Sequence, residues 1–332
     1  MARKNCPTAS GDRGGMVSLQ NAILLIDKDV DVTSFDTVNR LRKLTGSKKA
    51  GHSGTLDKFA SGLLVVCTGQ ATKLTRFFLE DRKRYIGTVR LGIRTDTDDK
   101  SGQVQERRDP SAVTEMDVAA AISRYIGEIR QKPPLFSALK IKGKRASDMA
   151  RNGDPVELGE RNVTIYRMDI KEFDNAGNRF TIDVTCSKGT YIRSLARDIG
   201  DDLGVGAHLE ALRRLESGFF SVENAVTMAE LGDYIRGETA SKRFISSPRE
   251  ALCEYSCCTV KNTARNKVLN GAKFSPEDIL NMSHGEKKTC IILDENQNFI
   301  AIADIDIEKW QIEYLNTFHG DDWFANQVTE WQ

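Results

Sequence analysis

The sequence predicts an α+β fold, in which helices flank a mixed, mostly antiparallel sheet and a small β-rich domain follows. Residues 163–173 and 179–186 read as two strands around the turn segment 174–178, which is typical of a β-hairpin. Apolar runs at residues 22–26 and 63–67 are typical of buried strands. Helical patterns occur between the strands without the regular repeat of a βαβ array, which argues against a doubly wound parallel sheet.

Length and composition indicate a globular protein with one large and one small domain. The chain has 332 residues, 29% of them are charged, and the mean hydropathy is −0.42. No apolar run reaches the roughly 20 residues that a membrane-spanning helix needs. We divide the chain into a flexible leader (1–20), a large domain (21–250) and a C-terminal domain with an acidic extension (251–332).

Charge is distributed unevenly between these domains. Residues 1–250 hold 41 Lys and Arg against 34 Asp and Glu, whereas residues 251–332 hold 7 against 13. The part of the chain before residue 251 is therefore the candidate for binding a polyanion.

The cysteines and histidines do not form a metal-binding pattern. The seven cysteines are scattered, and Cys253, Cys257 and Cys258 lack the spacing of a zinc knuckle. The four histidines are also spread along the chain, so we expect no metal site. Reduced thiols and an N-terminus without an apolar signal core indicate a cytoplasmic protein.

The first predicted helix leads to the most informative stretch. Thr33 and Ser34 predict an N-cap, and apolar residues at helical spacing continue to Gly46. The segment 51–73 follows and reads GHSGTLDKFASGLLVVCTGQATK. Asp57 lies there in a glycine-flanked loop, where a carboxylate can be placed for chemistry, although an aspartate that caps its own turn is the commoner case.

The next elements are again strands and helices. Residues 86–93 have the alternation of a strand, and Thr114 with Asp117 predicts a capping box at the start of a helix. A further helix is predicted over residues 195–203, which have an apolar face.

Three segments complete the predicted organisation. Residues 131–160 contain a basic run that fits either contact with a phosphate backbone or a solvated connector. The run consists of Lys140, Lys142, Lys144, Arg145 and Arg151. Residues 228–252 are polar and charged, so we expect a linker, and short strands at 289–293 and 299–305 predict a compact, separate module.

Three separated segments resemble the bacterial tRNA pseudouridine synthase B (TruB) family. They read GHSGTLDKFASGLL, KRYIGTVRLGIRTDTDD, and CSKGTYIRSLARDIG followed by GAHLEALRRL. The segment QKPPLFSALKIKGKRASDMARNG resembles that family's insertion, and the C-terminal part is similar to its PUA-type RNA-binding module. The resemblance extends from about Ala22 to Val222 and implies a pseudouridine synthase fold with its active site in a cleft across the sheet.

The resemblance implies that the protein isomerises uridine to pseudouridine in the T-loop of tRNA, at the position numbered 55 in that family's substrate. The N1–C1′ bond breaks and C5 bonds to C1′, so no group is imported and we expect no cofactor or metal. The implied partner is the stem-loop of the tRNA T-arm, which a protein recognises largely by its shape. We expect a monomer with no obligatory protein partner and no membrane association.

The resemblance also assigns roles to individual residues. Asp57 matches the nucleophile, Arg193 its paired arginine, and Tyr85 the tyrosine that stacks on the flipped base. A cation beside a carboxylate favours its ionised form, which a nucleophile needs. The other matched positions are expected to bind the substrate or support its loop: His52, Tyr191, Leu212, Lys28, Lys73 and Asp96.

Three positions depart from the family pattern. Asp29 and Lys58 stand where prolines are usual, and Phe136 replaces a frequent tyrosine. The missing prolines loosen two loops, so we expect an effect on the rate but no loss of a reacting group.

Two other functions fit the same residues. One is a guide-RNA-directed synthase of the same family, and the other is a non-catalytic protein that binds or folds RNA. The bacterial-type insertion at 131–160 argues against the first, and the intact Asp57, Tyr85 and Arg193 argue against the second.

Overall fold

The computed structural model describes residues 19–79, 82–137, 139–141, 144–152, 158–283 and 287–319. The strands are β1 (Ile23–Lys28), β2 (Ala50–His52), β3 (Ser61–Thr68), β4 (Lys83–Leu91), β5 (Ile93–Thr95), β6 (Val104–Arg107), β7 (Gly127–Gln131), β8 (Lys140–Ile141), β9 (Lys144–Arg145), β10 (Arg161–Asp174), β11 (Arg179–Cys186), β12 (Ala207–Ser217), β13 (Phe220–Ser221), β14 (Ile245–Ser246), β15 (Tyr255–Val260), β16 (Ile279–Ser283), β17 (Lys287–Leu293), β18 (Phe299–Asp306) and β19 (Gln311–Thr317). The α-helices are α1 (Ser34–Thr45), α2 (Thr75–Leu79), α3 (Glu115–Ser123), α4 (Ala146–Arg151), α5 (Ile192–Asp202), α6 (Met228–Arg236), α7 (Pro248–Ala251) and α8 (Asn262–Leu269). Short 3₁₀ turns are η1 (Leu19–Asn21), η2 (Gly69–Leu74), η3 (Val222–Asn224) and η4 (Pro276–Asp278).

A mixed, mostly antiparallel sheet organises the large domain, as predicted. Its ten strands include the path β14-β1-β3-β12-β4-β11-β10-β7, with β13 paired to β12 and β2 to β3. Among the described pairings of this sheet, β3 and β12 run parallel and the other neighbours run antiparallel. The parallel pair brings Arg214 opposite Gly62, just behind the Asp57 loop.

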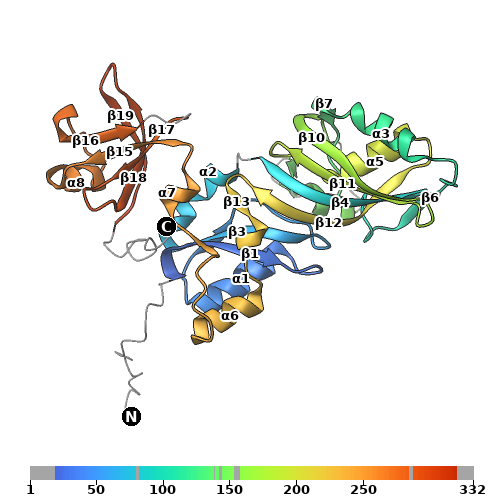
Figure 1. Cartoon of the computed structure of the whole chain (residues 1–332), viewed down its shortest axis with the longest axis horizontal. Helices are drawn as coiled ribbons and strands as arrows, with labels where there is room; N and C mark the ends of the chain where they lie inside the picture. Colours follow the sequence, from blue (N-terminus) through green and yellow to red (C-terminus); the bar gives the residue numbers. More distant parts are fainter. Residues whose placement is uncertain are drawn as a thin grey trace, which may run out of the picture.

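The sheet carries two hydrophobic cores, and the Asp57 loop lies where they meet. One core surrounds β1, β3, α1 and α6, and the other surrounds β4, β11, α3 and α5. Figure 1 shows these halves side by side, with β10, β11, α3 and α5 at the end far from the C-terminal sheet. Asp57 belongs to the connection between β2 and β3 in the first half, whereas Tyr85 on β4 packs in the second core.

Local signals in the sequence placed several helix ends correctly. The Thr114–Asp117 capping box begins α3, and the Thr33 side chain accepts a hydrogen bond from the Asp36 N–H at the start of α1. Gly46 ends α1 with φ +66°, a left-handed conformation that glycine adopts without strain.

The prediction of a linker at residues 228–252 is wrong. This segment contains α6, β14 and α7, and β14 pairs with β1 at the edge of the main sheet. Leu231, Tyr234 and Phe244 are fully buried in the first core. The segment looked polar because its few apolar residues are spaced along short elements, but most of the large ones are buried or partly buried in the first core.

The C-terminal domain forms a five-stranded sheet in the order β16-β15-β17-β18-β19. It has a core of its own. The prediction that it is separate from the large domain is wrong. Phe299, Phe318 and Ile302 belong to the same buried cluster as β1 and β3. Figure 1 shows this sheet, in orange and red, beside α2 and α7. The C-terminal sheet is therefore fixed to the large domain by a continuous apolar interface.

Candidate active site

Asp57 is held on a loop whose backbone is tied down at several points. The Ser34 hydroxyl donates to the Leu56 carbonyl (3.1 Å) and accepts from the Leu56 N–H (2.9 Å). Gly62 has φ +100°, and a Cβ at this position would lie 2.3 Å from the Arg214 carbonyl oxygen. The glycine-flanked loop predicted from the sequence is thus a close approach of two backbones, which only glycine allows here.

Arg193, at the start of α5, grips the Asp57 carboxylate with two nitrogens. Its Nε lies 2.9 Å from Asp57 Oδ2, and its Nη2 donates to Oδ1 over 3.1 Å. The Arg193 side chain is 4% exposed, whereas that of Asp57 is 37% exposed. The fork therefore fixes the carboxylate from its buried side and leaves the other side open to a ligand.

The rest of the Arg193 guanidinium is satisfied by the surrounding protein. Nη1 donates to the Thr97 carbonyl (3.0 Å) and to Asp99 Oδ2 (3.2 Å). Nη2 also donates to the Phe136 carbonyl (3.1 Å), so the 131–160 insertion contacts the site through its backbone. These bonds hold the guanidinium plane in one orientation.

Asp99 is the second acid of this cluster and was not identified from the sequence, which singled out Asp96 as a residue that binds the substrate or supports its loop. The Asp96 carboxylate accepts from the Gln103 N–H (2.8 Å) and stabilises the turn between β5 and β6. Asp98, between them in sequence, pairs with Arg197 at 2.8 Å. The three acids of the TDTDD segment thus have different partners. The sequence showed that several acids are present, but it did not show which of them meets Arg193.

Opposing forces act on the pKa of Asp57. Burial raises this pKa above its usual range, the positive charge of Arg193 lowers it, and the negative charge of Asp99 raises it again. The pKa of Asp57 is raised overall, and Arg193 is the group that most favours the ionised carboxylate. Loss of the Arg193 charge would therefore raise this pKa further.

Tyr85 and Arg214 lie on neighbouring strands of the sheet, beside Asp57. Tyr85 on β4 is 8% exposed and lies opposite Arg214 on β12. Burial raises the pKa of the Tyr85 hydroxyl, and the adjacent Arg214 opposes this shift. The phenol is thus a buried ring with a protonated hydroxyl, which suits stacking better than general-base chemistry.

Arg214 was not identified from the sequence. It is 1% exposed, its Nε donates to the Leu63 carbonyl (2.7 Å), and its Nη2 donates to the Gly54 carbonyl (3.1 Å). It therefore clamps both ends of the loop that carries Asp57. The feature of the sequence that could have identified Arg214 is an arginine within the largely apolar segment ALRRL.

The predicted wall residues lie around this cluster. Leu212 on β12 is 8% exposed and packs in the same core as Tyr85. The Tyr191 backbone exchanges two hydrogen bonds with the Gln131 side chain, at 2.8 and 3.0 Å. His52, at the end of β2, is half-buried, and both burial and the charge of Arg214 lower its pKa. The His52 imidazole is therefore neutral at neutral pH.

Lys28 supports the loop that carries Asp57 through hydrogen bonds to backbone carbonyls. It is 1% exposed, and its Nζ donates to the carbonyls of Asp29 and Val32, each at 2.7 Å, with the Lys58 carbonyl at 3.5 Å. Burial lowers the Lys28 pKa to about 8. The ammonium thus ties together the two loops in which Asp29 and Lys58 replace the family's usual prolines.

The structure does not bring Lys73 into the Asp57 cluster. Its Nζ donates to the Thr317 carbonyl (2.8 Å) and lies 5.2 Å from the centre of the Phe318 ring. Lys73 therefore joins the large domain to the end of the C-terminal sheet.

The predicted basic run of the insertion lies largely outside the described part of the chain. Lys142 is not described, nor are the side chains of Lys140, Lys144, Arg145 and Arg151. Its contact with a phosphate backbone therefore stays a prediction.

Neither a metal-binding cluster nor a membrane-spanning helix occurs in the part of the chain that the structure describes. They contain no group of three His, Cys, Asp or Glu side chains that could hold a metal ion. None of the described helices combines the length and the apolar character needed to cross a membrane.

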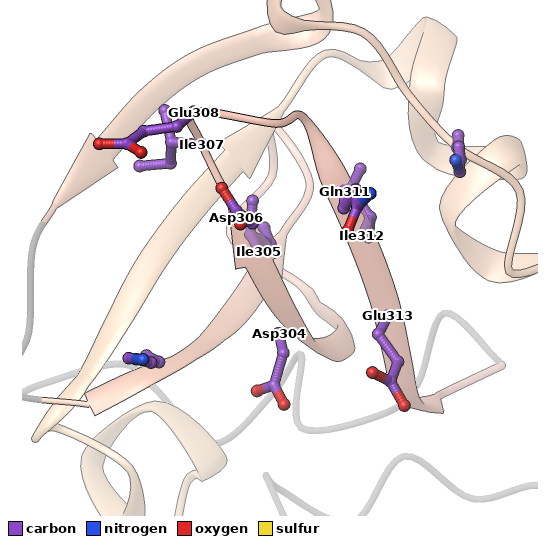
Figure 2. A pocket seen from close by; sticks show the side chains of 10 residues that line it. Asp304, Ile305, Asp306, Ile307, Glu308, Gln311, Ile312 and Glu313 are labelled. Carbon is purple, nitrogen blue, oxygen red and sulfur yellow. The ribbon is translucent and has the colours of Figure 1, made fainter.

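A cavity of about 640 Å³ lies on the C-terminal sheet, at the hairpin of β18 and β19. Four carboxylates line it, from Asp304, Asp306, Glu308 and Glu313, together with Lys273 and Lys288. Figure 2 shows Asp304 and Glu313 on neighbouring strands, and these residues are direct register partners. An excess of carboxylates makes this cavity unsuited to RNA phosphates.

Comparison with known proteins identifies relatives of the whole large domain. The sequence model of the TruB family pseudouridylate synthase N-terminal domain matches residues 42–192, and that of the tRNA pseudouridylate synthase B C-terminal domain matches residues 193–252. The tRNA pseudouridine synthase B of Ralstonia nicotianae is 48% identical over 213 residues, which are 64% of this chain and 68% of that protein. That of Alkaliphilus oremlandii is 37% identical over 305 residues, which are 87% of this chain and 99% of that protein.

Solved structures agree with these relatives. A chain of a Cbf5-Nop10-Gar1 complex superimposes with a TM-score of 0.70 at 26% identity, covering 92% of this chain and 88% of that one. A chain of an archaeal box H/ACA sRNP Nop10-Cbf5 complex gives a TM-score of 0.69 at 25% identity, covering 95% and 90%.

Proposed function

The chain belongs to the TruB family of pseudouridylate synthases and isomerises uridine to pseudouridine in tRNA, and we propose that Asp57 is its nucleophile and a T-loop uridine, at position 55, its target. The observation that carries the proposal is the Asp57–Arg193 fork, at 2.9 and 3.1 Å, with one side of the carboxylate open. The relatives named tRNA pseudouridine synthase B support the substrate class.

The reaction needs a group that adds to the nucleotide and then leaves. The N1–C1′ bond breaks, the uracil turns, C5 bonds to C1′, the C5 proton is lost and N1 gains a proton. A carboxylate that adds and departs divides this rearrangement into easier steps. Asp57 is suited to this role because one side of its carboxylate is open while the charge of Arg193 favours its ionised form.

Arg193 and Asp99 act as positioning residues. Arg193 Nη2 donates a hydrogen bond to Asp57 Oδ1, and Nε lies 2.9 Å from Oδ2, so the guanidinium holds the carboxylate in one orientation. Asp99 bonds the opposite nitrogen of the same guanidinium at 3.2 Å and supplies a second negative charge to the cluster. The pair fixes the direction of attack without itself contacting the uracil.

The target base must leave the RNA stack, which costs a few kcal/mol. Tyr85 supplies an aromatic surface for the flipped uracil, and Leu212 and Tyr191 form the walls around it. His52, neutral and at the mouth of the cleft, fills the space that the nucleotide vacates. Lys28 supports the loop, and Lys73 and Asp96 act at a distance from the reacting atoms.

The test is tritium release from a tRNA transcript labelled at uridine C5, with the wild type and Asp57→Asn compared. The product is mapped by carbodiimide primer extension, and no guide RNA or second protein is added. We expect release by the wild type only, at the T-loop, with tRNA binding by the variant within about three-fold of the wild type. Full turnover by Asp57→Asn would refute the assignment of the nucleophile.

The same assay separates the alternatives. Tight tRNA binding without release by the wild type would favour the non-catalytic RNA-binding protein. Release that requires an added guide RNA would favour the guide-directed synthase. The proposed monomer, without an obligatory protein partner, is tested by light scattering with and without tRNA, and the proposed cytoplasmic location by fractionation.

A further inference from the structure

A hollow of about 510 Å³ lies at the junction of the large domain and the C-terminal sheet, outside the Asp57 cleft. Its lining has three lysines (Lys48, Lys49 and Lys73), three amide side chains (Gln20, Asn21 and Gln70), and otherwise hydroxyls and glycines. Among the residues that the structure describes, no carboxylate and no large apolar side chain lines it. We call it the lysine hollow.

The positive charge of the lysine hollow is not neutralised within the described part of the chain. Lys48 and Lys49 are exposed, and no described carboxylate forms an ion pair with either of them or with Lys73. Burial lowers the pKa of Lys73, and the neighbouring charge of Lys49 lowers it further. Ammonium groups that repel one another in this way are stabilised when an anion binds between them.

The C-terminal sheet holds two residues of the hollow in place. The Gln70 side chain bonds the His319 backbone in both directions, donating to its carbonyl (2.5 Å) and accepting from its N–H (3.2 Å). Lys73 donates to the Thr317 carbonyl at 2.8 Å. The hollow is therefore shaped by both parts of the protein, although its lining comes from the large domain.

Strand β2 connects the hollow to the cleft. Lys49 directly precedes β2, and His52, which we propose fills the space of the flipped nucleotide, ends the strand. Three strand residues span about 10 Å. An RNA with its target nucleotide at Asp57 thus has backbone phosphates within a few nucleotides of the hollow.

We propose that the lysine hollow binds backbone phosphates of the substrate RNA outside the cleft, and that the C-terminal sheet promotes this binding by holding Gln70 and Lys73. The inference rests on the proposed function, since the ligand is the substrate RNA itself. It assigns to the C-terminal sheet an indirect role in RNA binding. The sheet's own cavity has four carboxylates against two lysines in its lining and does not take part.

The test compares two double variants that remove the same charge. Lys48→Gln with Lys49→Gln empties the hollow of its exposed lysines, and Lys273→Gln with Lys288→Gln is the matched control in the acidic cavity. We measure kcat and KM with full-length tRNA, and Kd as a function of salt concentration. For the hollow variant we expect KM and Kd to rise about ten-fold, with the loss in rate restored by saturating tRNA. The slope of log Kd against log salt should fall by about 1 to 2, because fewer counterions are released on binding.

The outcomes separate the inference from the proposed function. An unchanged KM and salt slope in the hollow variant, with an active wild type, would overturn the inference and leave the function intact. Equal losses in the hollow variant and the control would also overturn it, because they would show a general effect of net charge. Lys49→Glu is a further variant, and it should weaken tRNA binding more than Lys49→Gln does. A wild type that makes no pseudouridine would instead refute the function.

Discussion

The cleft and the lysine hollow both concentrate charge, but they hold it in opposite ways. In the cleft, Arg193 and Asp99 are 4% and 5% exposed, and both are paired. In the hollow, Lys48 and Lys49 are exposed and have no carboxylate partner among the described residues. Two regions a short strand apart thus use charge for different purposes.

The difference follows from solvation. A buried charge must be paired, and pairing in a dry site fixes the positions of the atoms involved. An exposed, unpaired charge has no fixed geometry, but it attracts a polyanion and releases counterions when the polyanion binds. Changes in the cleft should therefore alter kcat and its pH dependence, whereas changes in the hollow should alter KM and its salt dependence.

Among the residues that surround Asp57, the largest effect should come from Arg193→Lys, which replaces the guanidinium with a single ammonium. We expect kcat to fall about 10³-fold, or ~4 kcal/mol. The pKa of Asp57 should rise further, so that activity is lost at a higher pH as the solution is acidified. Arg197→Lys is the matched control, because Arg197 pairs with Asp98 and Asp198. A loss of similar size in the control would contradict the special role of the fork.

The buried Lys28 should make stability depend on pH. Its pKa of about 8 in the folded protein is below the ordinary value of 10.5, so the unfolded chain binds more protons between these values. Stability from this group therefore rises as pH increases from about 8 to 10.5, by up to ~3 kcal/mol. Urea denaturation of wild type and Lys28→Met at several pH values checks this. Parallel stability curves for the two proteins would show that Lys28 is not the source.

Asp99→Asn should have a smaller effect on rate but a distinct effect on pH dependence. Loss of its negative charge lowers the pKa of Asp57, so the acidic limb of the kcat profile should move to lower pH. We expect kcat to fall about ten-fold because Arg193 loses one partner. Asp96→Asn should not move the limb, since the Asp96 carboxylate bonds the Gln103 N–H. A shift with Asp96→Asn but not with Asp99→Asn would show that Asp99 is not the acid that acts on Asp57.

The smallest effect should come from restoring the family's usual prolines with Asp29→Pro and Lys58→Pro. Lys28 already holds the carbonyls of both positions, so the loops are supported without proline. We expect kcat within about two-fold of the wild type and a gain in stability of at most ~1 kcal/mol, measured by thermal unfolding. A large gain in kcat would show that the exposed Asp29 and Lys58 limit catalysis.

Local patterns in the sequence determined much of the fold. Alternation over residues 179–186, the capping box at Thr114 and the glycine at position 46 each act within a few residues, so a linear reading identifies them. The motif segments likewise singled out Asp57, Arg193 and Tyr85 as candidate site residues, and the structure places Arg193 beside Asp57. The resemblance to the family rests on those segments taken together.

The tertiary structure alone decided which side chains meet. Asp99 contacts Arg193 across 94 positions of sequence, and the choice among Asp96, Asp98 and Asp99 depends on how one turn is folded. Arg214 clamps the Asp57 loop, and Lys73 meets Thr317, only because distant strands are brought together. The burial of residues 228–252 and the shared apolar core of the two domains also depend on contacts between distant elements. A contact between distant residues depends on the packing of whole elements, and no local pattern in the chain records that packing.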